Sequence, residues 1–117
     1  MRYLVTDDSK LARRILKKSL CEYVQEENIY EACNGLEALK ASLKSKIDVI
    51  FLDLTMPVMD GYKTIPRLLD INPDVKVIVV SADIQQKAKE KVYALGATMH
   101  VEKPIQAHKM RKILEKL

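Results

Sequence analysis

The sequence alternates short β-rich runs with helical patterns, and this alternation restricts the fold more than any other feature. Runs rich in apolar and β-branched residues cover positions 2–6, 28–32, 48–52, 75–80 and 98–101. Strict β-α alternation favours a parallel sheet with helices on both faces. The unbroken apolar runs at 49–52 and 77–80 are typical of central strands buried on both sides. The sequence therefore predicts an α/β fold with five parallel strands in a (βα)5 arrangement, while several strand orders remain open.

Apolar residues at helical spacing indicate which helix faces are buried. The first helix is expected to start at a cap formed by Ser9 or Asp8. Its predicted buried stripe comprises Leu11, Ile15, Leu16, Leu20 and Tyr23. The last helix has the clearest period, with apolar side chains at Met110, Ile113, Leu114 and Leu117.

Three further helices are expected at 35–45, 62–71 and 84–95, with Gly96 as the C-cap of the last. Pro66 lies inside the second of these. Proline removes a backbone donor and clashes with the preceding turn, at about 3 kcal/mol in a helix interior. We therefore expect that helix to start late or to bend.

Composition limits the classes of function. A chain of 117 residues with 48% hydrophobic content fits one globular domain over residues 1–117. Its net charge of +4 is compatible with an anionic partner or with lysines that are merely solvated. Aromatic residues make up only 5%, and no zinc-finger or RNA-recognition pattern is present, so we expect no nucleic-acid partner.

Cellular location is predicted from what the sequence lacks. Cys21 and Cys33 have neither metal-ligand nor redox spacing, and are expected to be ordinary thiols. The chain shows no signal peptide and no apolar run of about 20 residues, the length that spans a membrane. The expectation is a cytoplasmic protein without membrane attachment.

Chemically reactive residues follow the predicted strands. Asp7 and Asp8 come after the first strand, Asp53 after the third, Ser81 after the fourth and Lys103 after the fifth. In an open parallel sheet, ligands bind outside the carboxyl ends of the strands. Clustered carboxylates repel one another unless a cation lies between them, and Mg2+ prefers oxygen ligands and often shares them with a phosphate. Asp8 taken alone has a simpler interpretation as a helix cap.

Asp53 ends an apolar strand and precedes a turn-rich loop, where a carboxylate can act as a nucleophile toward a phosphoryl group. Ser81 could donate a hydrogen bond to that group, and Lys103 could pair with it as a point charge. Each residue alone also suits an ordinary turn or a solvated surface. Their joint occurrence at successive strand ends favours phosphoryl chemistry.

The motifs Val5 to Ser9 (VTDDS), Asp53 to Gly61 (DLTMPVMDG), Ser81-Ala82 and Lys103-Pro104 occur in an order and spacing that resemble response-regulator receiver domains. The resemblance is to the stand-alone chemotaxis type and covers the chain from about Tyr3 to its end. It implies strand order 2-1-3-4-5 and a cis peptide bond between Lys103 and Pro104.

The resemblance also implies roles for individual residues. Asp53 would be the phosphoacceptor, with a sensor histidine kinase or a small donor such as acetyl phosphate supplying the phosphoryl group. The Mg2+ site would comprise Asp8, Asp53 and the backbone carbonyl of Thr55, with Asp7 orienting a metal-bound water. Ser81 would be the switch hydroxyl and Lys103 the cationic partner of the phosphoryl group.

A histidine occupies the place of the family's rotating aromatic residue. His100 lies three residues before Lys103, and its imidazole carries a titratable charge that a Tyr or Phe lacks. The resemblance and the basic residues of the last two helices together predict that a downstream protein binds the face made by the fourth helix, fifth strand and fifth helix. The alternative is that these lysines are only solvated and the partner binds elsewhere, for example at the first helix. The resemblance further implies a monomer that is not an enzyme, apart from self-catalysed phosphoryl transfer and loss.

Two other functions fit parts of the pattern. A Mg2+-dependent phosphohydrolase would also use an aspartate nucleophile, but Thr55 stands where the haloacid-dehalogenase type has its second aspartate. Alternatively, the chain is the receiver piece of a longer DNA-binding regulator.

Overall fold

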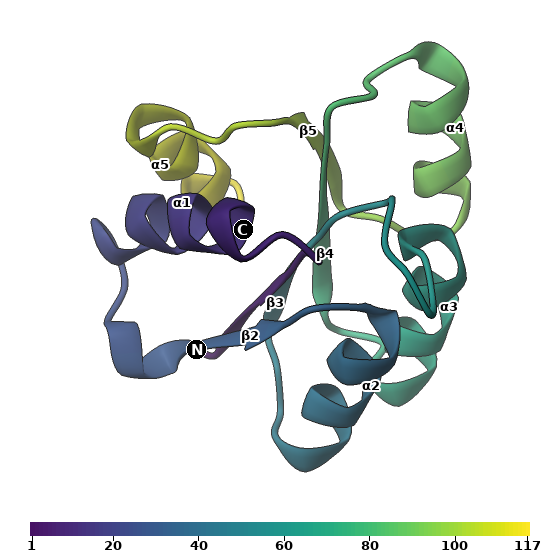
Figure 1. Cartoon of the computed structure of the whole chain (residues 1–117), viewed down its shortest axis with the longest axis horizontal. Coiled ribbons are helices and arrows are strands. Elements are labelled where there is room, and N and C mark those ends of the chain that lie inside the picture. The colour runs from purple at the N-terminus through teal and green to yellow at the C-terminus, as the bar shows by residue number, and fades with distance from the viewer.

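The computed structural model describes residues 1–117 and confirms the predicted β-α alternation (Figure 1). The strands are β1 (Tyr3–Thr6), β2 (Ile29–Ala32), β3 (Val49–Leu52), β4 (Lys76–Ser81) and β5 (Met99–Glu102). The helices are α1 (Lys10–Cys21), α2 (Gly35–Lys44), α3 (Gly61–Ile71), α4 (Gln86–Ala94) and α5 (Ala107–Glu115), and a 3-10 turn covers Glu26–Asn28.

All five strands are parallel and lie in the order β2-β1-β3-β4-β5, as the family resemblance implied. The two most apolar strands are central: every residue of β3 is buried, and β4 is buried after its first residue. β1 and β3 pair so that Thr6 lies opposite Leu52. The residues that follow these two strands therefore emerge side by side at one edge of the sheet.

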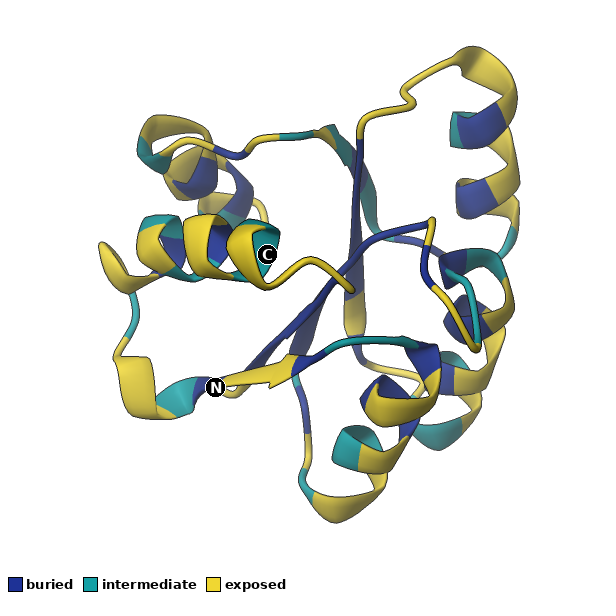
Figure 2. Ribbon diagram, viewed as in Figure 1, coloured by how far each residue is buried: buried dark blue, intermediate teal, exposed yellow.

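Helices cover both faces of the sheet (Figure 1). On one face, Leu16 and Leu20 of α1 pack with Met110 of α5 against Phe51 and other residues. α2, α3 and α4 cover the opposite face with a second apolar cluster. Figure 2 shows the central strands as the most continuously buried part of the chain. No helix has the length and apolar character that a membrane span requires.

The start of α1 is confirmed, but part of its predicted buried stripe is wrong. The Ser9 hydroxyl caps the helix by accepting the Ala12 N–H at 3.2 Å. Leu16 and Leu20 are buried, whereas Leu11 is 64% exposed and Ile15 44% exposed. With 3.6 residues per turn, Ile15 points about 100° and Leu11 about 140° away from Leu16. The sheet covers a narrower arc than this. Tyr23, also exposed, donates its hydroxyl proton to the Ala107 carbonyl.

The expected late start of α3 is also wrong. The helix begins at Gly61, where the Asp60 carboxylate accepts the Lys63 N–H at 2.9 Å, and runs unbroken through Pro66 to Ile71. Pro66 is exposed. The carbonyl one turn before it, which loses its helical partner, therefore faces the side of the helix that water can reach.

The end of α4 confirms the predicted role of Gly96. Its φ of 108° lies in the region that side-chain-bearing residues rarely adopt. The Gly96 N–H bonds to the Tyr93 carbonyl and the Ala97 N–H to the Val92 carbonyl, both at 3.0 Å. This pair of bonds is the Schellman arrangement. It turns the chain sharply from α4 into β5.

Candidate phosphoryl-acceptor and metal site

The three predicted aspartates meet at the carboxyl edge of β1 and β3. Asp7 and Asp53 follow paired strands and are buried, at 6% and 8% exposure, whereas Asp8 is exposed. One carboxylate oxygen from each lies within 4.8 Å of the others. The parallel pairing thus brings Asp53 close to two carboxylates that are 46 and 45 residues away in the chain.

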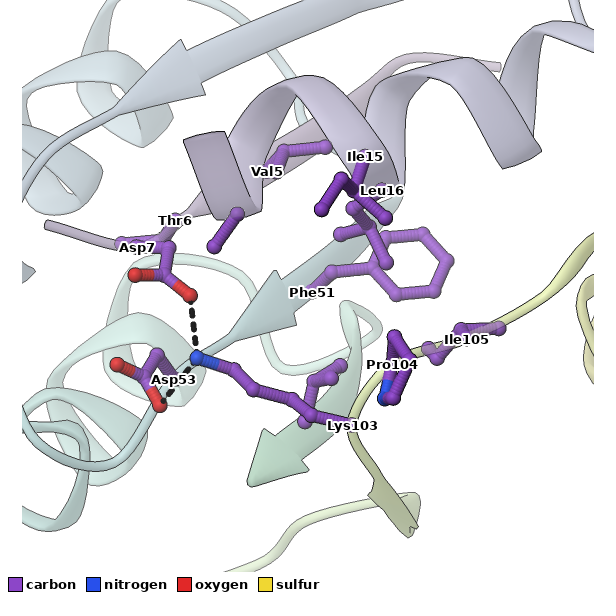
Figure 3. Close-up of a pocket in the computed structure, with 12 residues that line it drawn as sticks. Val5, Thr6, Asp7, Ile15, Leu16, Phe51, Asp53, Lys103, Pro104 and Ile105 are labelled. Carbon is purple, nitrogen blue, oxygen red and sulfur yellow. Dashed lines mark hydrogen bonds and ion pairs between the residues drawn. The ribbon is translucent and has the colours of Figure 1, made fainter. Parts of the chain in front are cut away.

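Lys103 reaches this cluster from the fifth strand (Figure 3). Its ammonium lies 2.6 Å from Asp7 Oδ2 and 3.3 Å from Asp53 Oδ1. Its backbone N–H donates to the Ser81 carbonyl, and its peptide bond to Pro104 is cis, as the resemblance implied. The sequence predicted Lys103 as the partner of a phosphoryl group, and the structure shows that it also holds Asp7.

The cluster carries an excess of negative charge. Burial and the neighbouring Asp7 charge raise the pKa of Asp53, and Lys103 only partly offsets this. Burial by itself would lower the pKa of Lys103, but its hydrogen bond to Asp7 and the charge of Asp53 raise it overall. One ammonium therefore faces three carboxylates.

This donor set fits a hard divalent cation. Carboxylate oxygens from Asp8 and Asp53 are the ligand type that Mg2+ prefers. A cation beside them would remove the repulsion that raises the pKa of Asp53. The resemblance to receiver domains implied a Mg2+ site at such an acidic pocket. Thr55 lies two residues past Asp53 in the loop. The resemblance implied that its backbone carbonyl is the third protein ligand of the metal.

The loop from Asp53 to Gly61 is held by close backbone packing. The Gly61 N–H donates to the Leu54 carbonyl at 2.9 Å. A Cβ atom on Gly61 would lie 2.5 Å from the Asp53 carbonyl oxygen and 2.8 Å from Leu54 Cα. Only glycine allows the start of α3 to approach the backbone of Asp53 and Leu54 this closely.

The same loop contains a strained residue that the sequence did not reveal. Val58 has a φ of 68° and is 76% exposed. The Met59 N–H donates to the Pro57 carbonyl at 2.7 Å, which closes a three-residue turn around it. A β-branched residue in this region is disfavoured, so the loop is held by its surroundings. Met59 supplies one such tie, because its carbonyl accepts the Gly35 N–H.

Ser81 ends β4 at the predicted edge, but its hydroxyl is engaged locally. It accepts the Asp83 N–H at 3.0 Å, and Asp83 Oδ1 accepts the Gln85 N–H at 3.0 Å. No hydrogen bond joins Ser81 to Asp53. These turns fix the loop before α4, which is why the helix begins at Gln86 and not at Ile84 as predicted.

His100 lies on the same face of the sheet as Ser81. It pairs with Val79 across β4 and β5, and side chains two residues apart on a strand share a face. Its ring is already buried, with the residue at 6% exposure. The ring therefore already lies inward in this structure. Whether the ring moves with phosphorylation stays a prediction.

A pocket that sequence reasoning missed adjoins the cluster. A cavity of about 190 Å3 lies between α1 and the segment after β5 (Figure 3). Ile15, Phe51 and Ile105 line it, and Asp7 and Lys103 stand at its polar end. The sequence contains no separate signal for it, because Ile15 was predicted to belong to the buried face of α1.

Comparison with known proteins agrees with this geometry. The response regulator receiver domain family matches residues 3–115. The chain is 35% identical to chemotaxis protein CheY of Listeria monocytogenes, over 99% of this chain and 97% of that one. It is 34% identical to CheY of Thermotoga maritima, over 99% and 96%.

A solved structure, that of chemotaxis protein CheY4 of Vibrio cholerae, aligns with a TM-score of 0.89 at 26% identity, covering 98% of this chain and 96% of that one. Its agreement extends over the five parallel strands and the helices on both faces. The chain therefore belongs to the response regulator receiver domain family and is a receiver of the chemotaxis type.

Proposed function

We propose that the protein is a phosphorylation switch in which Asp53 accepts a phosphoryl group and a partner protein recognises the result. The observation that carries this is the placement of Asp53 beside a cation and two further carboxylates. The Lys103 ammonium lies 3.3 Å from Asp53, and the acidic oxygens lie within 4.8 Å of one another.

Phosphoryl transfer to Asp53 would be a displacement at phosphorus. A carboxylate oxygen of Asp53 forms a bond to phosphorus, and the bond from phosphorus to the donor nitrogen or oxygen breaks with its electron pair leaving on the donor. Mg2+ held by Asp8, Asp53 and the Thr55 carbonyl would neutralise the phosphoryl oxygens. Asp7 would orient water there, and Lys103 adds a second cation. Hydrolysis of this acyl phosphate would be self-catalysed, with no separate substrate turned over.

Apolar side chains beside the cluster support a protein donor. Leu11 and Ile15 are exposed on α1, and Ile15 borders the cavity that contains Asp53 among its lining residues. An apolar patch of this kind suits contact with another protein. We propose that a sensor histidine kinase in the cytoplasm presents its phosphohistidine here.

Neither alternative function is favoured. Thr55 lies where the second aspartate of a haloacid-dehalogenase-type phosphohydrolase would be. The match to this chain covers 97% and 96% of the length of the two CheY relatives. A receiver of this size can therefore make up almost a whole protein.

Phosphoryl uptake is expected to require Mg2+ and Asp8. Incubation with acetyl phosphate and Mg2+ should add one phosphoryl group, detected by intact mass, and a chelator should prevent it. Asp8→Ala should bind Mg2+ at least tenfold more weakly, as one of two carboxylate ligands is lost. Asp70→Ala, at an exposed aspartate of α3, serves as the control. Equal Mg2+ affinity in the Asp8→Ala and wild-type proteins would place the metal elsewhere.

The output surface is proposed to be the face of α4, β5 and α5. Exposed cations gather on its two helices and at the end of α5, namely Lys87, Lys91, Lys109, Arg111, Lys112 and Lys116. Lys91 already makes an interaction within the protein, because its ammonium lies 4.1 Å from the centre of the Tyr62 ring. The remaining charge favours an acidic partner segment, whose affinity should fall as salt rises.

Reversing two of these charges should weaken the binding of an acidic peptide. Lys87→Glu with Lys112→Glu should raise its Kd by about tenfold at low salt, since each exposed charge contributes up to about 1 kcal/mol. Fluorescence anisotropy measures this, and phosphorylation should stay unchanged. Lys44→Glu with Lys46→Glu makes the same charge change at exposed sites far from this face. An equal loss in both double variants would show that only net charge matters.

A further inference from the structure

The imidazole of His100 is buried without any hydrogen-bond partner. The residue is 6% exposed, and neither Nδ1 nor Nε2 is paired. A neutral imidazole carries one N–H donor and one acceptor nitrogen. Buried polar atoms are normally satisfied, so two orphaned atoms on one ring need an explanation. A Phe or Tyr ring in the same place would not leave two unpaired nitrogens.

Charged groups near the ring come from α4 and from the loop before it, and β5 itself adds the exposed Glu102, which shares a face with His100. From α4, Lys89 donates to the His100 carbonyl at 3.4 Å, and the Tyr93 hydroxyl accepts the His100 N–H at 3.1 Å. From the loop before α4, Asp83 contributes its carboxylate and backbone carbonyl. β4 presents only the uncharged Val79 and Ser81 on this face.

These surroundings disfavour a protonated ring overall. Burial and the Lys89 charge lower the pKa of His100, and the backbone carbonyl and carboxylate of Asp83 only partly oppose them. That carbonyl lies near the ring but not in hydrogen-bond geometry. The neutral ring can stay buried, whereas a charged ring gains most by turning out to water.

We propose that His100 is a proton-sensitive latch, which stays buried beneath α4 when neutral and leaves that position when protonated. The side chains of Lys89 and Tyr93 in α4 both bond to the backbone of His100. The position of the ring is therefore coupled to the placement of α4 against β5. Acidification would thus change the surface of α4 and β5 without phosphorylation. An effect of acidification on partner binding rests on the function proposed above. The titration of His100 and the movement of α4 do not.

NMR titration of the unphosphorylated protein tests the latch. The chain has two histidines, and the other one, His108, is exposed on α5. In the folded protein the His100 ring should titrate at lower pH than in the urea-unfolded chain, because burial and the Lys89 charge lower its pKa. Amide shifts along α4 and β5 should change with the same midpoint as the His100 ring. A His100 ring that titrates alike in the folded and unfolded chains, or α4 amides that do not shift as it titrates, would overturn the proposal.

His100→Phe supplies the second test, because Phe fills a similar space without a titratable group. In this variant the acid-dependent shift changes of α4 should be lost, while His108→Gln should retain them. Persistence of the α4 changes in His100→Phe would also overturn the latch. If His100→Phe does not fold, the titration of His100 in the folded and unfolded wild-type chain still decides.

Stability should follow the same sign. A lowered pKa means that the folded protein binds fewer protons at His100 than the unfolded chain does. The His100 contribution to the free energy of unfolding is therefore present above the ordinary histidine pKa and decreases as pH falls below it. Urea unfolding should show that the free energy of unfolding decreases from neutral to mildly acid pH, and that this decrease is smaller in His100→Phe. An unchanged pH dependence in that variant would count against the latch.

Discussion

Replacing Asp53 with asparagine should abolish phosphoryl uptake while leaving the protein folded. The amide has almost the same size but no nucleophilic carboxylate oxygen, so no acyl phosphate can form. After incubation with acetyl phosphate and Mg2+, the mass gain of the wild-type protein should be absent, a loss of at least a hundredfold. Asp70→Asn, at an exposed site on α3, should be labelled like the wild type.

The same variant should be at least as stable as the wild type at neutral pH without metal. Burial and Asp7 raise the pKa of Asp53, so the folded protein holds this proton more tightly than the unfolded chain does. Its charge therefore destabilises the fold at pH values above that pKa, and asparagine removes the charge. Urea unfolding measures this. Label retained in Asp53→Asn would place the acceptor at another residue, and a large loss of stability would show that Asp53 is chiefly structural.

Gly61→Ala should destabilise the fold and slow phosphorylation together. Helix propensity alone predicts the opposite, because alanine within a helix is favoured over glycine by roughly 0.5 to 1 kcal/mol. The added Cβ would lie 2.5 Å from the Asp53 carbonyl oxygen and 2.8 Å from Leu54 Cα. Both are backbone atoms and cannot rotate away. Overpacking of this kind lowers the free energy of unfolding by about 1 to 3 kcal/mol.

Relieving the clash must displace the backbone that carries Asp53, the proposed phosphoacceptor. Urea unfolding should therefore show a lower midpoint, and the initial rate of labelling from acetyl phosphate should fall. Lys63→Ala, at an exposed position two residues further along α3, is the matched control and should change neither quantity appreciably. A Gly61→Ala protein with wild-type stability would mean that the loop can move to accommodate the Cβ atom. That result would contradict the tight packing of Gly61 against the Asp53 and Leu54 backbone.

The fold class and the location of the site could be predicted because they depend on local patterns. Alternation of apolar strands and helices favours a parallel sheet whatever its strand order. Parallel strands all end at one edge, so Asp7, Asp53 and Lys103 were predicted to meet before their distances were known. The strand order came from the family resemblance, because the alternation is compatible with several orders.

Contacts between distant segments determined what could not be predicted. Leu11 and Ile15 are apolar at helical spacing, yet the sheet covers only the arc that contains Leu16 and Leu20. Pro66 suggested a late or bent helix, but the cap at Asp60 and an exposed position allow α3 to start at Gly61. Spacing along the chain does not say which side of a helix meets a neighbour.

The functional residues show the same division. The sequence by itself determined which chemical groups stand at the strand ends, because strand periodicity and turn residues are encoded locally. Only the tertiary structure decided that Lys103 bonds to Asp7, that the Ser81 hydroxyl is held by its own loop, and that the His100 ring is buried with both nitrogens unpaired. Those outcomes depend on which side chains from separate elements compete for the same space and the same hydrogen bonds, and no local pattern records that competition.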